Sequence, residues 1–159
     1  MIPSGYIFYG SADFQARFSL PSERAQVLAS DYLSILGVQD ANEFSALVVE
    51  AKRDLQSIAV AAELRYGLKP PTVGRLALFL ANLASARSQQ RRQLDLGITK
   101  CIWLVSSCGR ASGDPNAGHL LFSGQEFDPS IGMRTEGQYI LPGVSVGCTC
   151  VSKSVIPGF

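Results

Sequence analysis

The sequence predicts an α+β fold in which an N-terminal three-helix bundle is followed by a small glycine-rich β module. Up to residue 97, apolar residues recur at helical spacing within segments that begin at capping residues and end at glycine or proline. After that point, short β-branched and apolar runs alternate with loops rich in glycine and serine. The length of 159 residues is sufficient for a buried core. We therefore expect an extended arm over residues 1–20, a helical region over 21–97 and a β module over 98–159.

The composition argues against several classes of protein. Because 47% of the residues are hydrophobic and only 17% are charged, we expect the chain to fold rather than remain disordered. The same balance suits either a compact helical core or a surface that is buried against partners. A formal net charge of +1 gives no strong overall attraction to nucleic acid or membrane. No uninterrupted apolar stretch is long enough for a transmembrane helix, so we expect no membrane partner.

The N-terminal segment is rich in aromatic residues. Residues 1–10 lack the basic start and long apolar stretch of a signal peptide, which predicts a protein made and kept in a cytoplasm or in a particle assembled there. In such a compartment the four cysteines are expected to be thiols or metal ligands rather than disulfides. The aromatic and β-branched residues around Gly5 and Gly10 predict a short strand or an extended arm. This arm either reaches a neighbouring subunit or folds onto its own core.

The helical region is predicted to contain three helices. The first spans residues 22–37, with Ser22 as its cap and a glycine at its end. The second begins at Asp40 and spans residues 40–66, before a glycine and a Pro-Pro pair. The third spans residues 72–94. In the second helix, one buried stripe is predicted from Phe44, Leu47, Val48, Ala51, Leu55, Ile58 and Ala62.

The end of the third helix is basic and rich in glutamine. Arg87 and Arg91 are one turn apart and are therefore expected to share a face. Such a face can contact phosphate or an acidic partner. Such a helix end is more often a solvated face, and its cations also suit the C-terminal end of a helix.

The β module is predicted to consist of short strands and loops. A strand is expected over 98–105, two short strands around a turn over 119–124 and 125–127, and extended pieces over 138–141 and 144–152, with loops over 108–118 and 128–137. Trp103, in the first strand, is either a core anchor or a partner contact. The apolar tail that ends at Phe159 is a second candidate for docking on a partner.

Four residues of the β module form a candidate metal site. Cys148 and Cys150 flank one residue, so in an extended strand both sulfurs would face the same side. With Cys108 and His119 they would complete a tetrahedral Cys3His zinc site, which would stabilise loops with few hydrogen bonds. The alternative is small buried thiols without metal, and Cys101 is expected to be such a core residue.

A catalytic interpretation of the same residues is weaker. A cysteine nucleophile would need His119 as its base, but no glycine-framed turn or third group orders such a pair. We therefore expect no catalytic residue and no cofactor other than zinc.

The order of motifs in the last third of the chain resembles a known module. The matching elements are Lys100 with Trp103, Ser106-Ser107, Arg110, His119 with Gly124-Gln-Glu-Phe127, Pro142-Gly143 and Gly147-Cys148-Thr-Cys150. This order, and the spacing from histidine to glycine, is similar to the closing module of phage head morphogenesis proteins of the Mu F-like minor head protein family. Gly147 and Thr149 stand where that family usually has asparagine and arginine.

The resemblance implies a structural role in a virus particle. It implies a non-enzymatic minor head protein of a tailed phage, assembled in the host cytoplasm and located in the virion. Capsid or portal protein, other virion proteins and further copies of the chain are the implied partners, with packaged DNA as an additional one. Two alternatives stay open: a capsid-decorating, connector or tail-junction protein, and a metal-assisted hydrolase or nuclease-like toxin module built on His119 and the cysteines.

Overall fold

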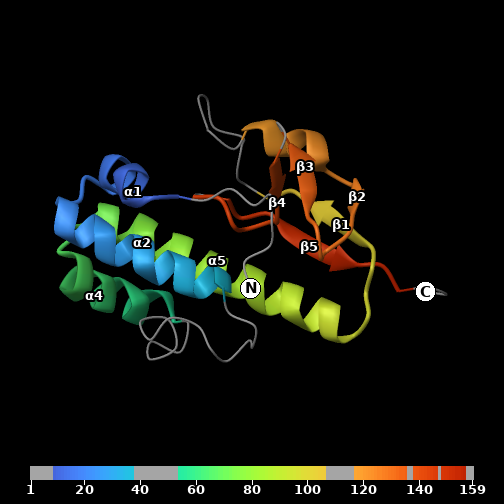
Figure 1. Ribbon diagram of the computed structural model, residues 1–159, viewed down its shortest axis with the longest axis horizontal. Coiled ribbons are helices and arrows are strands. Elements are labelled where there is room, and N and C mark those ends of the chain that lie inside the picture. The colour runs from blue at the N-terminus through green and yellow to red at the C-terminus, as the bar shows by residue number, and fades with distance from the viewer. Residues whose placement is uncertain (1–8, 38–53, 107–116, 136–137, 147, 157–159) are drawn as a thin grey trace. The chain divides into compact units, whose positions relative to one another are not determined.

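The computed structural model describes residues 9–37, 54–106, 117–135, 138–146 and 148–156, and it confirms the α+β class. The described residues contain four α-helices rather than three (Figure 1). They divide into a helical unit, which ends at Ala84, and a β unit, which begins at Ser85. The expected boundary near residue 97 is therefore wrong, because the C-terminal part of the last helix belongs to the β unit.

Helix α1 (Ser11–Phe18) replaces the extended arm expected over residues 11–18. Its first turn is capped because the Gly10 N–H donates to the Asp13 carboxylate at 2.9 Å. Phe14 and Phe18 lie one turn apart and are both buried, so the aromatic content forms one helical face rather than a strand. The helix ends at Ser19, which adopts the left-handed conformation with φ 52°. Residues 1–8 lie outside the described residues.

Helix α2 (Ser22–Gly37) has the predicted bounds. Helix α4 (Leu55–Tyr66) begins much later than expected. Its N-cap is Asp54, whose backbone is extended and whose carboxylate accepts from the Ser57 N–H at 3.2 Å and the Ser57 hydroxyl at 2.8 Å. A continuous helix over residues 40–66 is therefore wrong at Asp54.

The predicted stripe of the second helix is only partly open to comparison with the structure. Phe44, Leu47, Val48 and Ala51 lie outside the described residues. Ile58 and Ala62 are fully buried, as the stripe predicts, whereas Leu55 is 46% exposed. Because Leu55 is the first residue of α4, it lies at the helix end rather than within a continuous buried face.

Two groups of contacts hold the helical unit together. Aromatic rings from α1, α2, the first part of α5 (Thr72–Asp95) and the residue Tyr9 before α1 pack in one cluster. Its members are Tyr9, Phe14, Phe18, Tyr32 and Phe79. Between α2 and α4, the Asp31 carboxylate accepts from Arg65 Nε at 2.6 Å, from Arg65 Nη2 at 2.9 Å and from the Tyr66 hydroxyl. Burial raises the pKa of Tyr66, and the bond to Asp31 raises it further.

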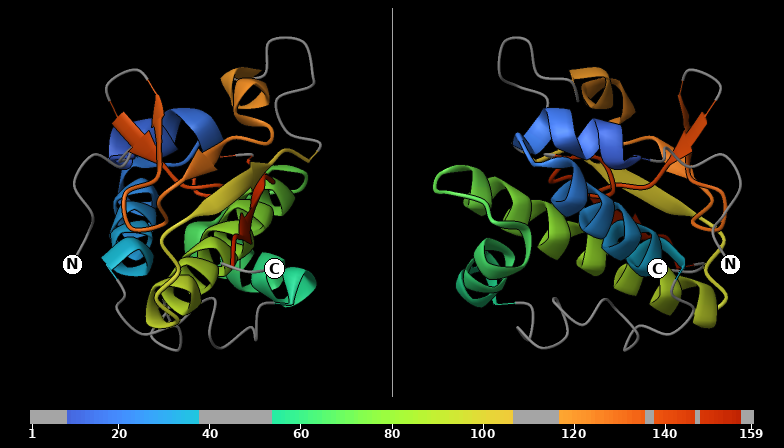
Figure 2. Two further views of the ribbon diagram at one scale, coloured as in Figure 1. Left: turned by 90° about the vertical axis from the view of Figure 1, so that its right-hand side faces the viewer. Right: turned by 60° about the vertical axis from the view of Figure 1, so that its left-hand side comes forward.

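A three-stranded antiparallel sheet forms the centre of the β unit. Its order is β2 (Glu126–Phe127), β1 (Cys101–Leu104) and β5 (Val151–Ser154). Trp103 pairs with Ser152 in this sheet, and β1 lies beside β5 in Figure 2. The Gln93 amide of α5 donates to the hydroxyls of Ser152 at 3.0 Å and Ser154 at 3.2 Å, which ties the end of α5 to the sheet.

The β unit also contains a two-stranded antiparallel sheet. The loop expected over residues 128–137 is therefore wrong in part, because one of these strands lies within it. Strand β3 (Met133–Thr135) pairs with β4 (Gln138–Ile140), the latter as predicted. The extended piece expected over 144–152 is also shorter, since only its last part joins β5. None of the helices in the described part of the chain combines the length and apolar character that crossing a bilayer requires.

Gly132, which precedes β3, is expected to tolerate no side chain. Its φ is +99°, and a Cβ built on it would lie 2.6 Å from the Ile140 carbonyl oxygen. Backbone strain and the collision together predict that Gly132→Ala lowers the free energy of unfolding by about 2–4 kcal/mol. Urea denaturation measures this loss. Gly118→Ala is the matched control, because nothing lies within 4 Å of its Cβ position, and we expect a change within about 0.5 kcal/mol. Equal losses for the two variants would contradict the prediction.

Candidate metal centre

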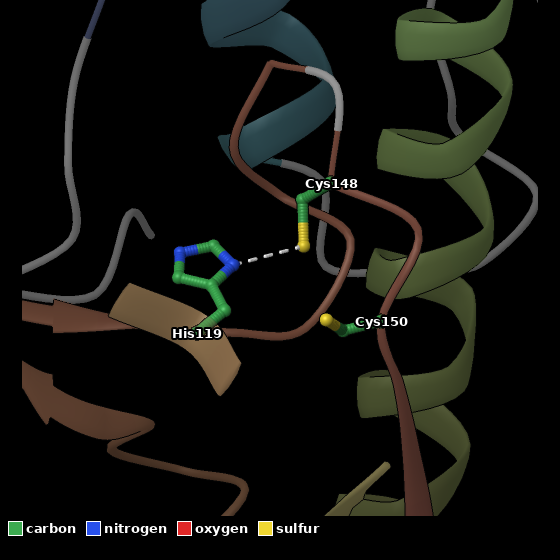
Figure 3. A group of neighbouring side chains, drawn as sticks. All are labelled: His119, Cys148 and Cys150. Carbon is green, nitrogen blue, oxygen red and sulfur yellow. Dashed lines mark hydrogen bonds between the residues drawn. The ribbon is translucent and has the colours of Figure 1, made fainter. Parts of the chain in front are cut away.

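Three of the four predicted metal ligands meet in the β unit. His119, Cys148 and Cys150 each offer one ligand atom, and these atoms all lie within 4.8 Å of one another. Figure 3 shows the imidazole directed toward the Cys148 sulfur, with the Cys150 sulfur nearby. The fourth predicted ligand, Cys108, lies outside the described residues.

His119 is positioned by a short helix rather than by the strand expected over 119–124. It lies on the 3-10 helix η1 (Ala117–Phe122). The turn after η1 is tied to β1 by two backbone bonds: the Gly124 N–H donates to the Trp103 carbonyl at 2.9 Å, and the Trp103 N–H donates to the Gln125 carbonyl at 2.9 Å. Gly124 has φ +78°, which suits the tight turn. These bonds fix the end of the histidine segment against the sheet.

The Trp103 ring fixes the imidazole from the side of β1. It is fully buried and meets His119 edge-on, with the ring centroids 5.5 Å apart. Phe122 and Phe127 contact the same indole at 5.0 and 5.9 Å, and Phe122 also stacks on the imidazole at 5.8 Å. His119 therefore sits in an aromatic pocket that limits its rotation.

Cys148 and Cys150 precede β5 and do not lie in a strand, but their sulfurs do lie close together, as predicted. A turn that begins at the predicted Pro-Gly pair positions the first sulfur. The Gly143 N–H donates to Cys148 Sγ at 3.3 Å, and the Cys148 N–H donates to the Ser145 carbonyl at 3.0 Å. Gly143 has φ +82°, which lets its N–H point back at the sulfur.

The surroundings of Cys148 favour its protonated thiol in the absence of a cation. Cys148 Sγ lies 3.4 Å from His119 Nδ1. Its hydrogen bond with Cys150 raises the pKa of Cys148, and burial raises it further. A reactive cysteine nucleophile needs a lowered pKa, so this environment does not favour a thiolate attacking a substrate.

Two sulfurs and one imidazole nitrogen form a soft donor set. Such donors are typical of zinc sites. The structure also suits the alternative of buried thiols, because a thiol and an imidazole at 3.4 Å can share a weak hydrogen bond. Cys101 lies outside the cluster and is fully buried, which confirms its predicted core position. Burial raises the pKa of Cys101, and Asp128 adds to that rise.

The residues predicted to bind partners differ in how exposed they are to solvent. Trp103 is fully buried, which supports the core role and corrects the expected partner contact. Arg87 is only 8% exposed and bonds to the Gln90 side chain, so the expected basic surface does not include it. Arg91 is partly exposed and pairs with Asp95 at 3.4 Å. Phe159 lies outside the described residues.

The sequence did not indicate that the polar end of α5 is buried against the strands and loops of the β unit. The Gln90 amide donates to the Pro129 carbonyl at 2.8 Å, and the Gln93 amide reaches the two serines of β5. Both glutamines are 3% exposed. Their spacing of three residues on one helix face was the available signal.

Comparison with known proteins identified no relative of this chain. The centre is therefore defined by its own geometry: a histidine from η1 and two cysteines before β5, gathered beside a buried tryptophan. No protein-family model, curated protein or solved structure matches the chain.

Proposed function

We propose that this chain is a structural protein of a tailed-phage virion, a minor head protein that acts near the capsid and portal without turning over a substrate. The proposal rests on one observation, a convergence: residues that are far apart in the sequence pack around the same point of the β unit. Seven of the residues through which the C-terminal segment resembles Mu F-like minor head proteins lie around one buried centre; they are Trp103, His119, Gly124, Phe127, Gly143, Cys148 and Cys150.

This convergence supports the resemblance because order along a chain does not by itself require contact. Trp103 touches His119 and Phe127, and His119 touches Cys148, although these residues come from separate elements. These motif residues therefore belong to one folded module, as the proposed resemblance requires.

The surface of the β unit supports a role in assembly. Its exposed large apolar residues are Leu96, Leu104, Leu120, Leu121, Ile131, Val151 and Ile156. Leu121, next to the candidate metal centre in η1, is 76% exposed. Apolar side chains of this size at the surface supply the area that a protein buries against capsid, portal or another copy of itself.

Copy number in the particle tests the proposal. Purified particles of the phage that encodes this chain are analysed by quantitative mass spectrometry, with the major capsid protein as the internal standard. We expect the chain to be present in few copies per particle, because a minor head protein is limited by its place near the portal. Its absence from the particle would overturn the virion role. An abundance close to that of the capsid protein would instead favour the capsid-decorating alternative.

A further inference from the structure

We propose that His119, Cys148 and Cys150 bind a zinc ion that cross-links η1 to the segment leading into β5. The proposal goes beyond the virion role and does not depend on it, because it concerns how the β unit is held together. It rests on distances, donor chemistry and the contacts around the three side chains.

The distances agree with coordination of a single ion. Zinc bonds of about 2.3 Å to sulfur and about 2.0–2.1 Å to nitrogen, at a tetrahedral angle, separate the two donor atoms by about 3.6 Å. Cys148 Sγ and His119 Nδ1 are 3.4 Å apart. The Cys150 sulfur completes a group in which every pair of donor atoms is within 4.8 Å. Small side-chain rotations would bring all three donors onto one ion.

The surroundings of the donors suit a bound cation. Gly143 donates its N–H to Cys148 Sγ at 3.3 Å, and a backbone donor of this kind stabilises negative charge on a coordinating sulfur. Trp103 and Phe122 hold the imidazole ring in place. The three ligands are at most 8% exposed, so thiolates there require a neighbouring positive charge to offset their desolvation.

The donor types favour zinc over magnesium and calcium. Magnesium and calcium prefer oxygen ligands, and the described cluster contains only sulfur and nitrogen donors. Three protein ligands leave one position of the tetrahedron for water or a further protein group. Because η1 and the cysteine segment belong to different parts of the β unit, one shared ion would restrain both.

Metal analysis of the purified full-length chain tests the site. The chain is produced without a histidine tag in zinc-supplemented medium, and its metals are measured by mass spectrometry. We expect about one zinc ion per chain. His119→Ala, Cys148→Ala and Cys150→Ala should each reduce the bound zinc to near background. Cys101→Ala is the matched control, because it removes a buried thiol outside the cluster and should retain the metal.

A second measurement keeps the test decisive if the ligand variants fail to fold. Cobalt(II) replaces zinc in the wild-type chain, and its visible spectrum should show tetrahedral geometry together with sulfur-to-cobalt charge transfer. A wild-type chain that takes up neither zinc nor cobalt would overturn the proposal, as would full zinc retention in Cys148→Ala. Neither result bears on the copy number in the particle, so the virion role and the zinc site can fail separately.

Discussion

Trp103→Ala is expected to lower the free energy of unfolding of the β unit by about 3–5 kcal/mol. The indole is fully buried at the centre of the sheet and contacts the rings of His119, Phe122 and Phe127. Its removal would leave a cavity bordered by the fixed backbone of β1, so the surrounding rings could collapse only in part. The loss therefore includes both buried apolar area and the cavity.

The variant Trp103→Phe separates packing from polar effects. Among the described residues, no acceptor lies within hydrogen-bond distance of Trp103 Nε1, so the smaller ring sacrifices volume without breaking a bond seen there. We expect a loss of about 1–3 kcal/mol for this variant.

Unfolding in urea is followed by far-UV circular dichroism, because Trp103 is the chain's single tryptophan and its replacement removes that fluorescence. Leu104→Ala serves as the neighbouring control. Its side chain is 39% exposed, and we expect a loss of about 1 kcal/mol or less. If Trp103→Ala destabilised the chain no more than Leu104→Ala, the indole could not be the centre of the β unit.

Local signals predicted the helices where capping and stopping residues lie next to the helix itself. The bounds of α2 and the start of α5 agree with the sequence because serine, threonine, glycine and proline act on adjacent backbone. The start of α4 was missed because apolar spacing continues through Asp54, while the cap depends on the bonds that Ser57 donates to the Asp54 carboxylate. Helix α1 was missed because aromatic residues suit a strand as well as a helix.

The ligand set was predictable in part because donor chemistry is visible in residue type. Histidine and cysteine identify a soft metal site wherever they meet, and three of the four predicted ligands do meet. The distances between the donor atoms were not predictable, because they depend on the Gly143 turn and on the bonds that tie the end of η1 to β1. The short apolar run around His119 gave no period that distinguishes a strand from a 3-10 turn.

The burial of Arg87 at the end of α5 was likewise not predictable from the sequence. Charge and glutamine content favour a solvated helix face, and this holds for Arg91. Gln90 is buried instead and donates to the Pro129 carbonyl, and the buried Arg87 donates to the Gln90 side chain. Only the tertiary contact decides between the two outcomes, since buried polar groups are retained where they find hydrogen-bond partners.

Phe14→Ala is expected to be the most damaging single substitution in the described helical unit, with a loss of about 3–5 kcal/mol. Its ring is fully buried and lies 5.3 Å from Tyr32 of α2 and 6.0 Å from Phe79 of α5, measured between centroids. Phe14 thereby connects three helices. Alanine would remove the shared contact and leave a cavity in the aromatic cluster.

The loss should be accompanied by local unfolding of α1. This helix has 8 residues, and helices of that length are not stable in water without tertiary contacts. Hydrogen exchange should therefore accelerate in α1 of Phe14→Ala more than in α2, while denaturation reports the total loss. Gln15→Ala is the matched control, because Gln15 is exposed on the same helix and should change stability by about 0.5 kcal/mol or less. Unchanged exchange in α1 of Phe14→Ala would mean that Phe18 alone holds the helix in place, and the cluster would then have a different centre.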